Sequence, residues 1–140
     1  MDIVFVCNTA SGSSILTNLV LAAHAKEQGA DVGILFTQDA LAAVCGRTFE
    51  WPLLLRGRQE QMTIARNAKE AAIPVVSERD SRQTDIPALL RATRAKGVRL
   101  LACPIWSKLL APLQLPPELE PLGQDVLLKL VEERKVAGLF

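Results

Sequence analysis

Residues 97–110 have the sequence Gly97-Val-Arg-Leu-Leu-Ala-Cys103-Pro-Ile-Trp-Ser-Lys-Leu-Leu110, and this stretch decides the predicted fold. Its first half, residues 98–103, is a short run dominated by apolar side chains, which is typical of a buried parallel strand. Pro104 follows at once, and it suits the first turn of a helix because the N–H groups of that turn lack helical partners. We therefore predict a strand over residues 98–103, a helix over residues 105–110, and Cys103 at the junction between them.

Strands and helices are predicted to alternate along the rest of the chain. Short apolar runs predict further strands at residues 2–7, 30–37, 73–77 and 135–140. Helical spacing of apolar residues, with capping residues and terminal glycines, predicts helices at residues 13–28, 38–45, 58–72, 84–97 and around 126–131. Such alternation indicates a three-layer α/β/α sandwich with a mainly parallel, five-stranded, Rossmann-like sheet. Residues 1–140 are predicted to form one domain, with a less regular insertion or flap at about residues 47–72.

Composition narrows the class of protein. The 140 residues are 49% hydrophobic, which is enough to bury a self-contained core. The formal net charge is only +1, so binding to nucleic acid or to an anionic membrane is not expected. The N-terminus lacks the features of a signal peptide, and no apolar run spans a bilayer, so we expect a cytoplasmic protein. Cys7, Cys45 and Cys103 are odd in number and widely spaced, which predicts free thiols without a disulfide, a metal or another cofactor.

Two of the cysteines end predicted strands, where ligands of parallel α/β sheets bind. Cys103 is the candidate nucleophile, because the strand end is expected to expose its sulfur and the dipole of the following helix favours the thiolate. The alternative is that Cys103 is a small buried hydrophobe among apolar neighbours. The pocket or anion site predicted around these strand ends comprises Cys7, Asn8, Thr9, Ser11, Gly12, Ser13, Pro104 and Trp106.

The stretch at residues 97–110 resembles the segment around the cysteine of the DsrE/DsrF-like family. The similarity extends to the N-terminal strand, loop and helix, to residues 29–37 and to residues 130–140, and is weakest at residues 47–72. It implies a sulfur carrier, or a sulfurtransferase-like protein, that holds a persulfide on Cys103. It also implies sulfur donor and acceptor proteins and a homo-oligomer, with trimer or hexamer as the expected state. The alternative function is a non-catalytic oligomeric domain that binds a small ligand or anion and has an inert cysteine.

Residues 3–14 bear a superficial similarity to the catalytic loop of low-molecular-weight phosphotyrosine phosphatases. That chemistry needs Cys-x5-Arg, because the arginine clamps the phosphate and stabilises developing charge. Here the corresponding residue is Ser13, and no Asp-Pro general acid occurs late in the chain. Phosphatase activity is therefore not expected. The loop could still hold an anion at the start of the next helix, or Ser13 and Ser14 could simply cap that helix.

The remaining candidate residues have structural explanations. Cys45 lies at a helix end, where the dipole disfavours a thiolate, so packing is the expected role. His24 is predicted to be a partly buried structural histidine, and Trp51 and Trp106 are expected in the core or at a subunit contact.

Two polar or irregular segments have open interpretations. Arg79, Asp80 and Arg82 are interpreted as solvated loop charges or as ligands for a charged molecule at the sheet edge. Residues 47–58 lack periodicity and are predicted to be the most mobile part of the chain.

The mean hydropathy of +0.21 and the absence of Tyr predict self-association through the apolar segments 51–55 and 109–115.

Overall fold

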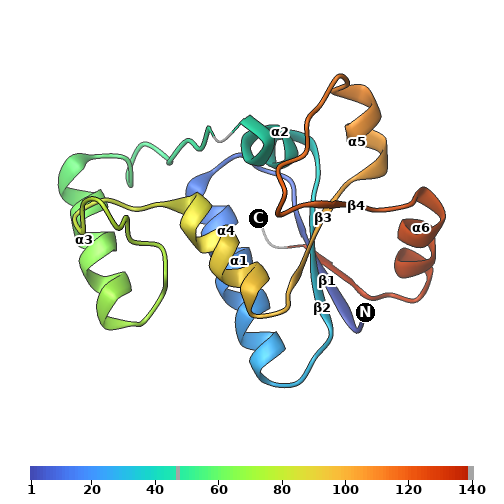
Figure 1. The fold of residues 1–140 in the computed structure, drawn as a ribbon, viewed down its shortest axis with the longest axis horizontal. Helices are drawn as coiled ribbons and strands as arrows, with labels where there is room; N and C mark the ends of the chain where they lie inside the picture. Colours follow the sequence, from blue (N-terminus) through green and yellow to red (C-terminus); the bar gives the residue numbers. More distant parts are fainter. Residues whose placement is uncertain (47, 139–140) are drawn as a thin grey trace.

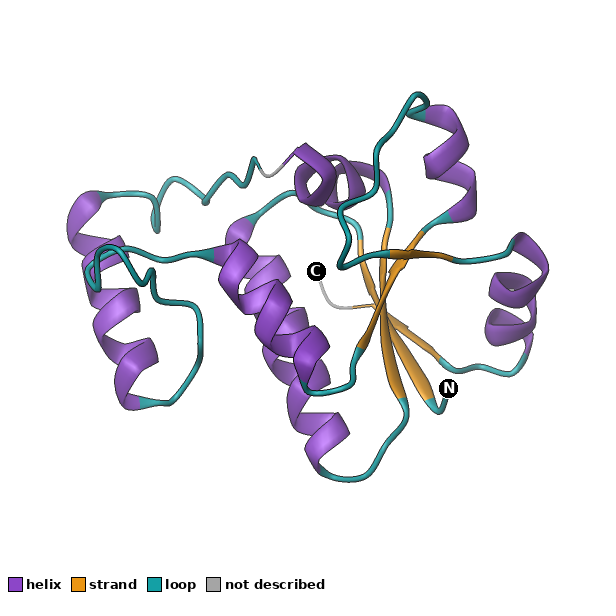
Figure 2. Cartoon of the chain, in the orientation of Figure 1, coloured by secondary structure: helices purple, strands orange, loops and turns teal. Residues whose placement is uncertain are grey.

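The computed structural model describes residues 1–46 and 48–138, and within them it shows an α/β fold with a parallel sheet (Figures 1 and 2). The strands are β1 (Ile3–Cys7), β2 (Val32–Phe36), β3 (Arg99–Ala102), β4 (Glu120–Pro121) and β5 (Val136–Gly138). Their order across the sheet is β4-β3-β2-β1-β5, and every neighbouring pair is parallel. The helices are α1 (Gly12–Glu27), α2 (Gln38–Gly46), α3 (Arg58–Glu70), α4 (Ile86–Ala95), α5 (Pro104–Leu109) and α6 (Gln124–Glu132).

The predicted fold class is confirmed, but one strand of the five was assigned wrongly. Residues 73–77 form no strand, since Val76 makes only an isolated antiparallel bridge with Thr84. Pro74 lacks a backbone N–H, which disfavours a central strand there. The additional strand is β4, whose two exposed residues pair with the end of β3. The predicted strand at residues 135–140 forms over β5, and residues 139–140 lie outside the described residues.

Side chains of the sheet alternate between two faces, and each face has its own hydrophobic core. The α1-side core contains residues of β1, β2 and β3 packed with α1, α2 and α4, and its larger members include Ile15, Leu19, Ile34, Phe36, Leu41, Leu89 and Leu100. The α6-side core comprises Val4, Leu35, Leu101, Cys103, Leu122 and Leu130. Helices α1 and α4 therefore cover one face while α6 lies on the other, as a three-layer arrangement requires (Figure 1).

Local capping explains where α4 begins and ends. Asp85 caps α4 by accepting a hydrogen bond from the backbone N–H of Ala88 at 3.0 Å. Gly97 follows that helix with φ of +99°, a conformation that glycine adopts without strain. The prediction for α1 was less accurate, because its N-cap is Ser11 rather than Ser13 or Ser14.

Helix α3 lies apart from the sheet layers, at the left of Figure 1. Only Ala65 and Ala68 of this helix are buried, as expected for so polar a helix. The helix predicted at residues 58–72 is confirmed as α3, and residues 48–57 lead to it without helix or strand, as expected. Arg47 lies outside the described residues, and the mobility of residues 48–58 stays a prediction.

Candidate functional site

Cys103 lies at the junction predicted from sequence, between the end of β3 and the start of α5. Its backbone N–H donates a hydrogen bond to the carbonyl oxygen of Phe36 at 3.0 Å. Its own carbonyl oxygen accepts a hydrogen bond from the N–H of Ser107, also at 3.0 Å. The backbone of Cys103 is therefore fixed to both the sheet and the helix that follows.

The expectation that the strand end exposes the sulfur is wrong. Cys103 is only 4% exposed and belongs to the α6-side core. The alternation along β3 puts Cys103 on the same face as Leu101, and Leu122 and Leu130 contribute to the same buried cluster. Any reaction at this thiol therefore requires a movement that uncovers it.

The helix that follows Cys103 is weakly anchored. No residue of α5 is buried, and the side chains of Ile105 and Leu109 are exposed. Trp106 is half-buried and packs against both the α1-side and the α6-side cores. Segments with few buried apolar contacts open locally at a small free-energy cost, so α5 is suited to transient displacement from Cys103.

Cys7, the other strand-end cysteine, lies on the opposite face of the sheet. It is fully buried in the α1-side core, whereas Cys103 is in the α6-side core. Burial raises the pKa of the Cys7 thiol to about 11, although hydrogen bonds from the Ser14 side chain and the Thr9 backbone partly oppose that increase. The two cysteines therefore do not share one pocket, and Cys7 is a poor nucleophile at neutral pH.

The raised pKa of Cys7 predicts a loss of stability at alkaline pH. The unfolded thiol ionises near pH 9, while the folded thiol stays neutral until about pH 11, so stability is lost as pH rises through that interval. Two pKa units correspond to roughly 3 kcal/mol in the free energy of unfolding. Urea unfolding of wild type and Cys7→Ala, followed by circular dichroism, should show this extra loss in wild type alone. Parallel pH profiles for the two proteins would contradict the assignment to Cys7.

The loop after β1 is covered by residues 50–51 rather than open as a cradle. The N–H of Gly12 donates to the carbonyl oxygen of Glu50 at 2.8 Å, and a methyl group added at Gly12 would lie 2.8 Å from Cε2 of Trp51. The side chains of Ser11 and Ser13 hydrogen-bond each other at 2.8 Å. Anion binding at this loop stays a prediction, and the structure does not join the loop to Cys103.

No family model and no curated protein matches this chain. The relationship to DsrE/DsrF-like proteins therefore stays a prediction based on the quoted segments. A parallel α/β fold hosts many functions, so the fold alone does not assign one.

The remaining predicted residues had mixed outcomes. Cys45 packs against the α1-side core, and burial raises its pKa, which confirms a packing role. Trp51 and Trp106 also pack on the core, as expected. The prediction for His24 was wrong: its side chain is 67% exposed, and Nδ1 lies 4.0 Å from Oε2 of Glu27. His24 falls outside the buried stripe of α1, which explains the error.

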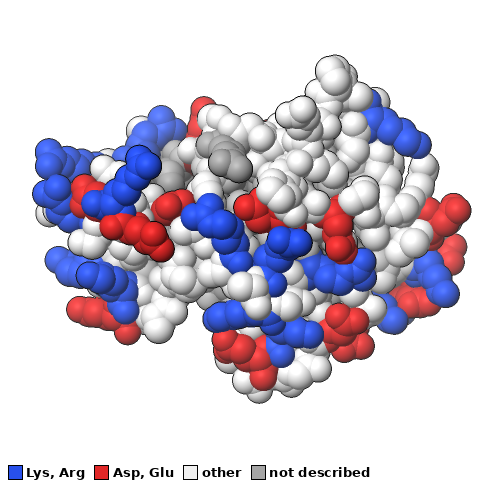
Figure 3. Space-filling view, viewed as in Figure 1, with Lys and Arg blue, Asp and Glu red and all other residues white. Residues whose placement is uncertain are grey.

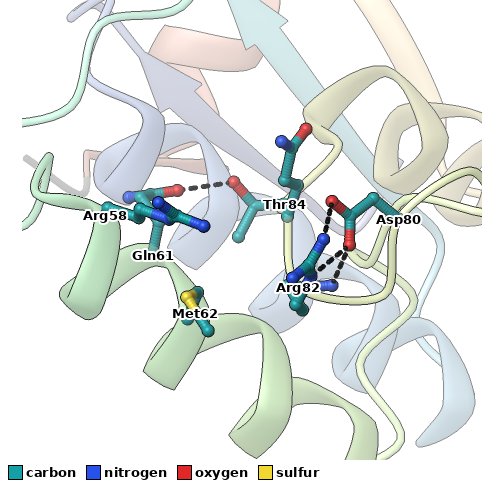
Figure 4. A pocket seen from close by; sticks show the side chains of 7 residues that line it. Arg58, Gln61, Met62, Asp80, Arg82 and Thr84 are labelled. Carbon is teal, nitrogen blue, oxygen red and sulfur yellow. Dashed lines mark hydrogen bonds and ion pairs between the residues drawn. The ribbon is translucent and has the colours of Figure 1, made fainter.

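The loop containing Asp80 and Arg82 does not lie at the carboxyl edge of the sheet, because the strand expected before it is absent. It lies instead beside α3, where it lines a cavity of about 430 Å³ with Arg58 and Gln61 (Figure 4). Sequence reasoning missed Arg58 and Gln61. Their three-residue spacing put them on one face of the predicted helix, but nothing indicated which loop that face meets.

No helix in the described ranges, 1–46 and 48–138, is long and apolar enough to cross a membrane. Within the same ranges, no group of three or more His, Cys, Asp or Glu side chains is placed to hold a metal ion.

Proposed function

We propose that the protein is a sulfur carrier, or a sulfurtransferase-like protein, that accepts persulfide sulfur on Cys103 and passes it to an acceptor thiol. The observation that carries this proposal is the position of Cys103 at the end of β3, directly before a helix that has no buried residues. Cys7 lies beneath α1 with a pKa of about 11, and burial also raises the pKa of Cys45. The resemblance of residues 97–110 to the DsrE/DsrF-like segment supports the same cysteine.

The proposed reaction needs only a nucleophilic sulfur and a docked partner. The Cys103 thiolate attacks the outer sulfur of a donor persulfide, the donor's S–S bond breaks, and the donor leaves as a thiolate. Cys103 then holds the persulfide, and an acceptor thiolate removes its outer sulfur in the same way, without net oxidation. Each step resembles thiol–disulfide exchange, which requires no metal and no oxyanion hole.

An exposed apolar surface beside Cys103 is suited to docking of the donor or acceptor protein. Ile105 of α5 and Leu127, Leu128 and Val131 of α6 line a cavity of about 300 Å³ there. Of the α6 side chains only Leu130 is buried, so most of the apolar stripe expected to face the core is available for a partner. A partner bound on this surface would lie next to the helix that must move. Reduced thiols of this kind suit the proposed cytoplasmic location.

The alkylation rates of the three cysteines test the proposal. At neutral pH we expect Cys103 to react with iodoacetamide faster than Cys45, although Cys45 is the more exposed of the two in the structure. The reason is that displacement of α5 uncovers the Cys103 sulfur, whereas burial raises the pKa of Cys45 and lowers its thiolate fraction. Peptide mass spectrometry over a time course gives both rates in one sample. A Cys103 that reacts more slowly than Cys45 would exclude the carrier.

The second candidate function is a non-catalytic, oligomeric domain that binds a small ligand or anion and has an inert Cys103. The observation that favours it is the 4% exposure of Cys103, which equally suits a thiol that only packs. Both candidates share the same fold, and the alkylation rates distinguish them.

We also propose that the chain self-associates as a homo-oligomer. Leu53 and Leu54 are 77% and 85% exposed, and further large apolar side chains are exposed on α5 and α6. Exposed apolar surface of this extent is typical of protein contacts, and the family resemblance implies a trimer or hexamer. Light scattering at micromolar concentration should give a mass well above the 15.2 kDa of one chain. A monomer under those conditions would refute self-association.

A further inference from the structure

A second candidate binding site lies between α3 and the loop that precedes α4 (Figure 4), across the molecule from α5, the helix that follows Cys103 (Figure 1). The first turns of α3 and the loop line an open pocket of about 430 Å³, a volume within the range of small-molecule sites. Its lining residues are Arg58, Gln61, Met62, Asp80, Arg82, Gln83 and Thr84. We call it the Arg58 cavity.

The wall of the Arg58 cavity is held in place by hydrogen bonds. The Thr84 hydroxyl lies 2.7 Å from Oε1 of Gln61 and donates to it, and Nε2 of Gln61 donates to the Leu55 carbonyl at 2.6 Å. Thr84 is also bridged to Val76 through the backbone. Gln61 of α3 therefore connects this helix to the loop that contains Thr84. These hydrogen bonds hold the two walls of the cavity together without a ligand.

The charges of the cavity are unequally paired. Arg82 makes two hydrogen bonds to Asp80, from Nε to Oδ1 at 3.0 Å and from Nη2 to Oδ2 at 3.3 Å. Arg58 makes no ion pair within the described residues. The pKa of Asp80 is lowered mainly by its hydrogen bonds with Arg82, and the positive charge of Arg58 adds to that effect. The lining therefore has two guanidinium groups and one carboxylate. At the left of Figure 3, the end of the molecule that contains α3, Lys and Arg side chains gather with acidic side chains among them.

We propose that the Arg58 cavity binds a small metabolite through a carboxylate or phosphate group, with Arg58 as the main contact to the oxyanion. A guanidinium presents a planar fork of donors that matches either group. Gln83 supplies a polar side chain that can orient the remainder of the ligand, and the thioether of Met62 suits an apolar part. This site is independent of the sulfur chemistry proposed for Cys103.

The arrangement of charges predicts opposite effects for two substitutions. Arg58→Gln removes the unpaired guanidinium and should weaken anion binding about tenfold or more, since hydrogen bonds between charged groups are stronger than those between neutral groups. Asp80→Asn removes the competing carboxylate and releases Arg82, so it should tighten binding severalfold. Its amide oxygen can still accept the hydrogen bond that the Arg82 backbone N–H gives to Asp80 Oδ1 at 3.0 Å, so the loop is preserved. A purely structural role of these residues predicts no gain from either change.

The experiment is a titration of ¹⁵N-labelled full chain with inorganic phosphate and, separately, with acetate, at constant ionic strength. We expect saturable shifts of the Gln83 and Thr84 amides, weakened by Arg58→Gln and strengthened by Asp80→Asn. The control is Arg66→Gln, which removes the same charge from α3 outside the cavity. Tighter binding of one probe than of the other identifies the group recognised.

Two results would overturn the assignment: non-saturable shifts with both probes, or equal weakening by Arg58→Gln and Arg66→Gln. Circular dichroism of each variant establishes that it is folded. Cys103→Ser should bind the probes as wild type does, so failure of the sulfur proposal and failure of this one are distinguishable.

Discussion

Replacement of Trp106 by alanine is expected to raise the rate at which Cys103 reacts with iodoacetamide by about tenfold or more. Trp106 is half-buried and packs against both cores, whereas no residue of α5 is buried. Removing a fully buried Trp costs about 3–5 kcal/mol, so roughly 2 kcal/mol is a reasonable loss here. Each 1.4 kcal/mol changes an equilibrium about tenfold, so the open population of α5 should increase by at least that factor.

The matched control for this prediction is Trp51→Ala. Trp51 also packs on the α1-side core, but it contacts the start of α1 rather than α5. Its loss should destabilise the chain without selectively exposing Cys103. Equal acceleration in both variants would show that Cys103 reacts through global unfolding, and no acceleration in Trp106→Ala would show that α5 does not control access.

Most of the fold was predictable because its signals are local. Residues 97–110 have an apolar run followed by a proline, and the structure places β3 and α5 there. Asp85 and Gly97 bound α4 as their conformational preferences predict. Local capping and turn chemistry act within a few residues of the chain, so they are readable before the tertiary structure is known.

The two errors in the sheet have a common cause. Residues 73–77 have the composition of a strand, but pairing depends on a neighbour that the sequence does not specify. Glu120 and Pro121 have poor strand propensity and pair only because the preceding segment brings them beside β3. The position of each segment in the tertiary structure therefore determined whether it pairs as a strand.

The candidate sites were predicted less well than the fold, because both depend on contacts between distant segments. Period-two alternation puts Leu101 and Cys103 on one face, but burial of that face depends on Leu122, which precedes α6, and on Leu130 within α6. The Arg58 cavity likewise combines α3 with a loop more than twenty residues later, as the hydrogen bond between Gln61 and Thr84 shows. In neither case does the local sequence show which distant segment will pack against the site.

Persulfide loading of defined variants tests the central claim, that Cys103 is the sulfur-carrying residue, most directly. Wild type, Cys103→Ser and Cys7→Ser are incubated with a cysteine desulfurase and cysteine, and protein-bound persulfide is measured with its position mapped by mass spectrometry. Serine is close in size to cysteine but lacks the sulfur that accepts sulfane sulfur. Cys7→Ser tests whether loss of a different strand-end thiol has the same effect, and circular dichroism checks that each variant is folded.

We expect wild type and Cys7→Ser to be labelled on Cys103 and Cys103→Ser to lose the label completely. The reason is that Cys7 is fully buried with a pKa of about 11, whereas Cys103 directly precedes α5, a weakly anchored helix whose Trp106 packs against the same core as the Cys103 side chain. Equal labelling of wild type and Cys103→Ser, or a label that maps to Cys7 or Cys45, would contradict the account.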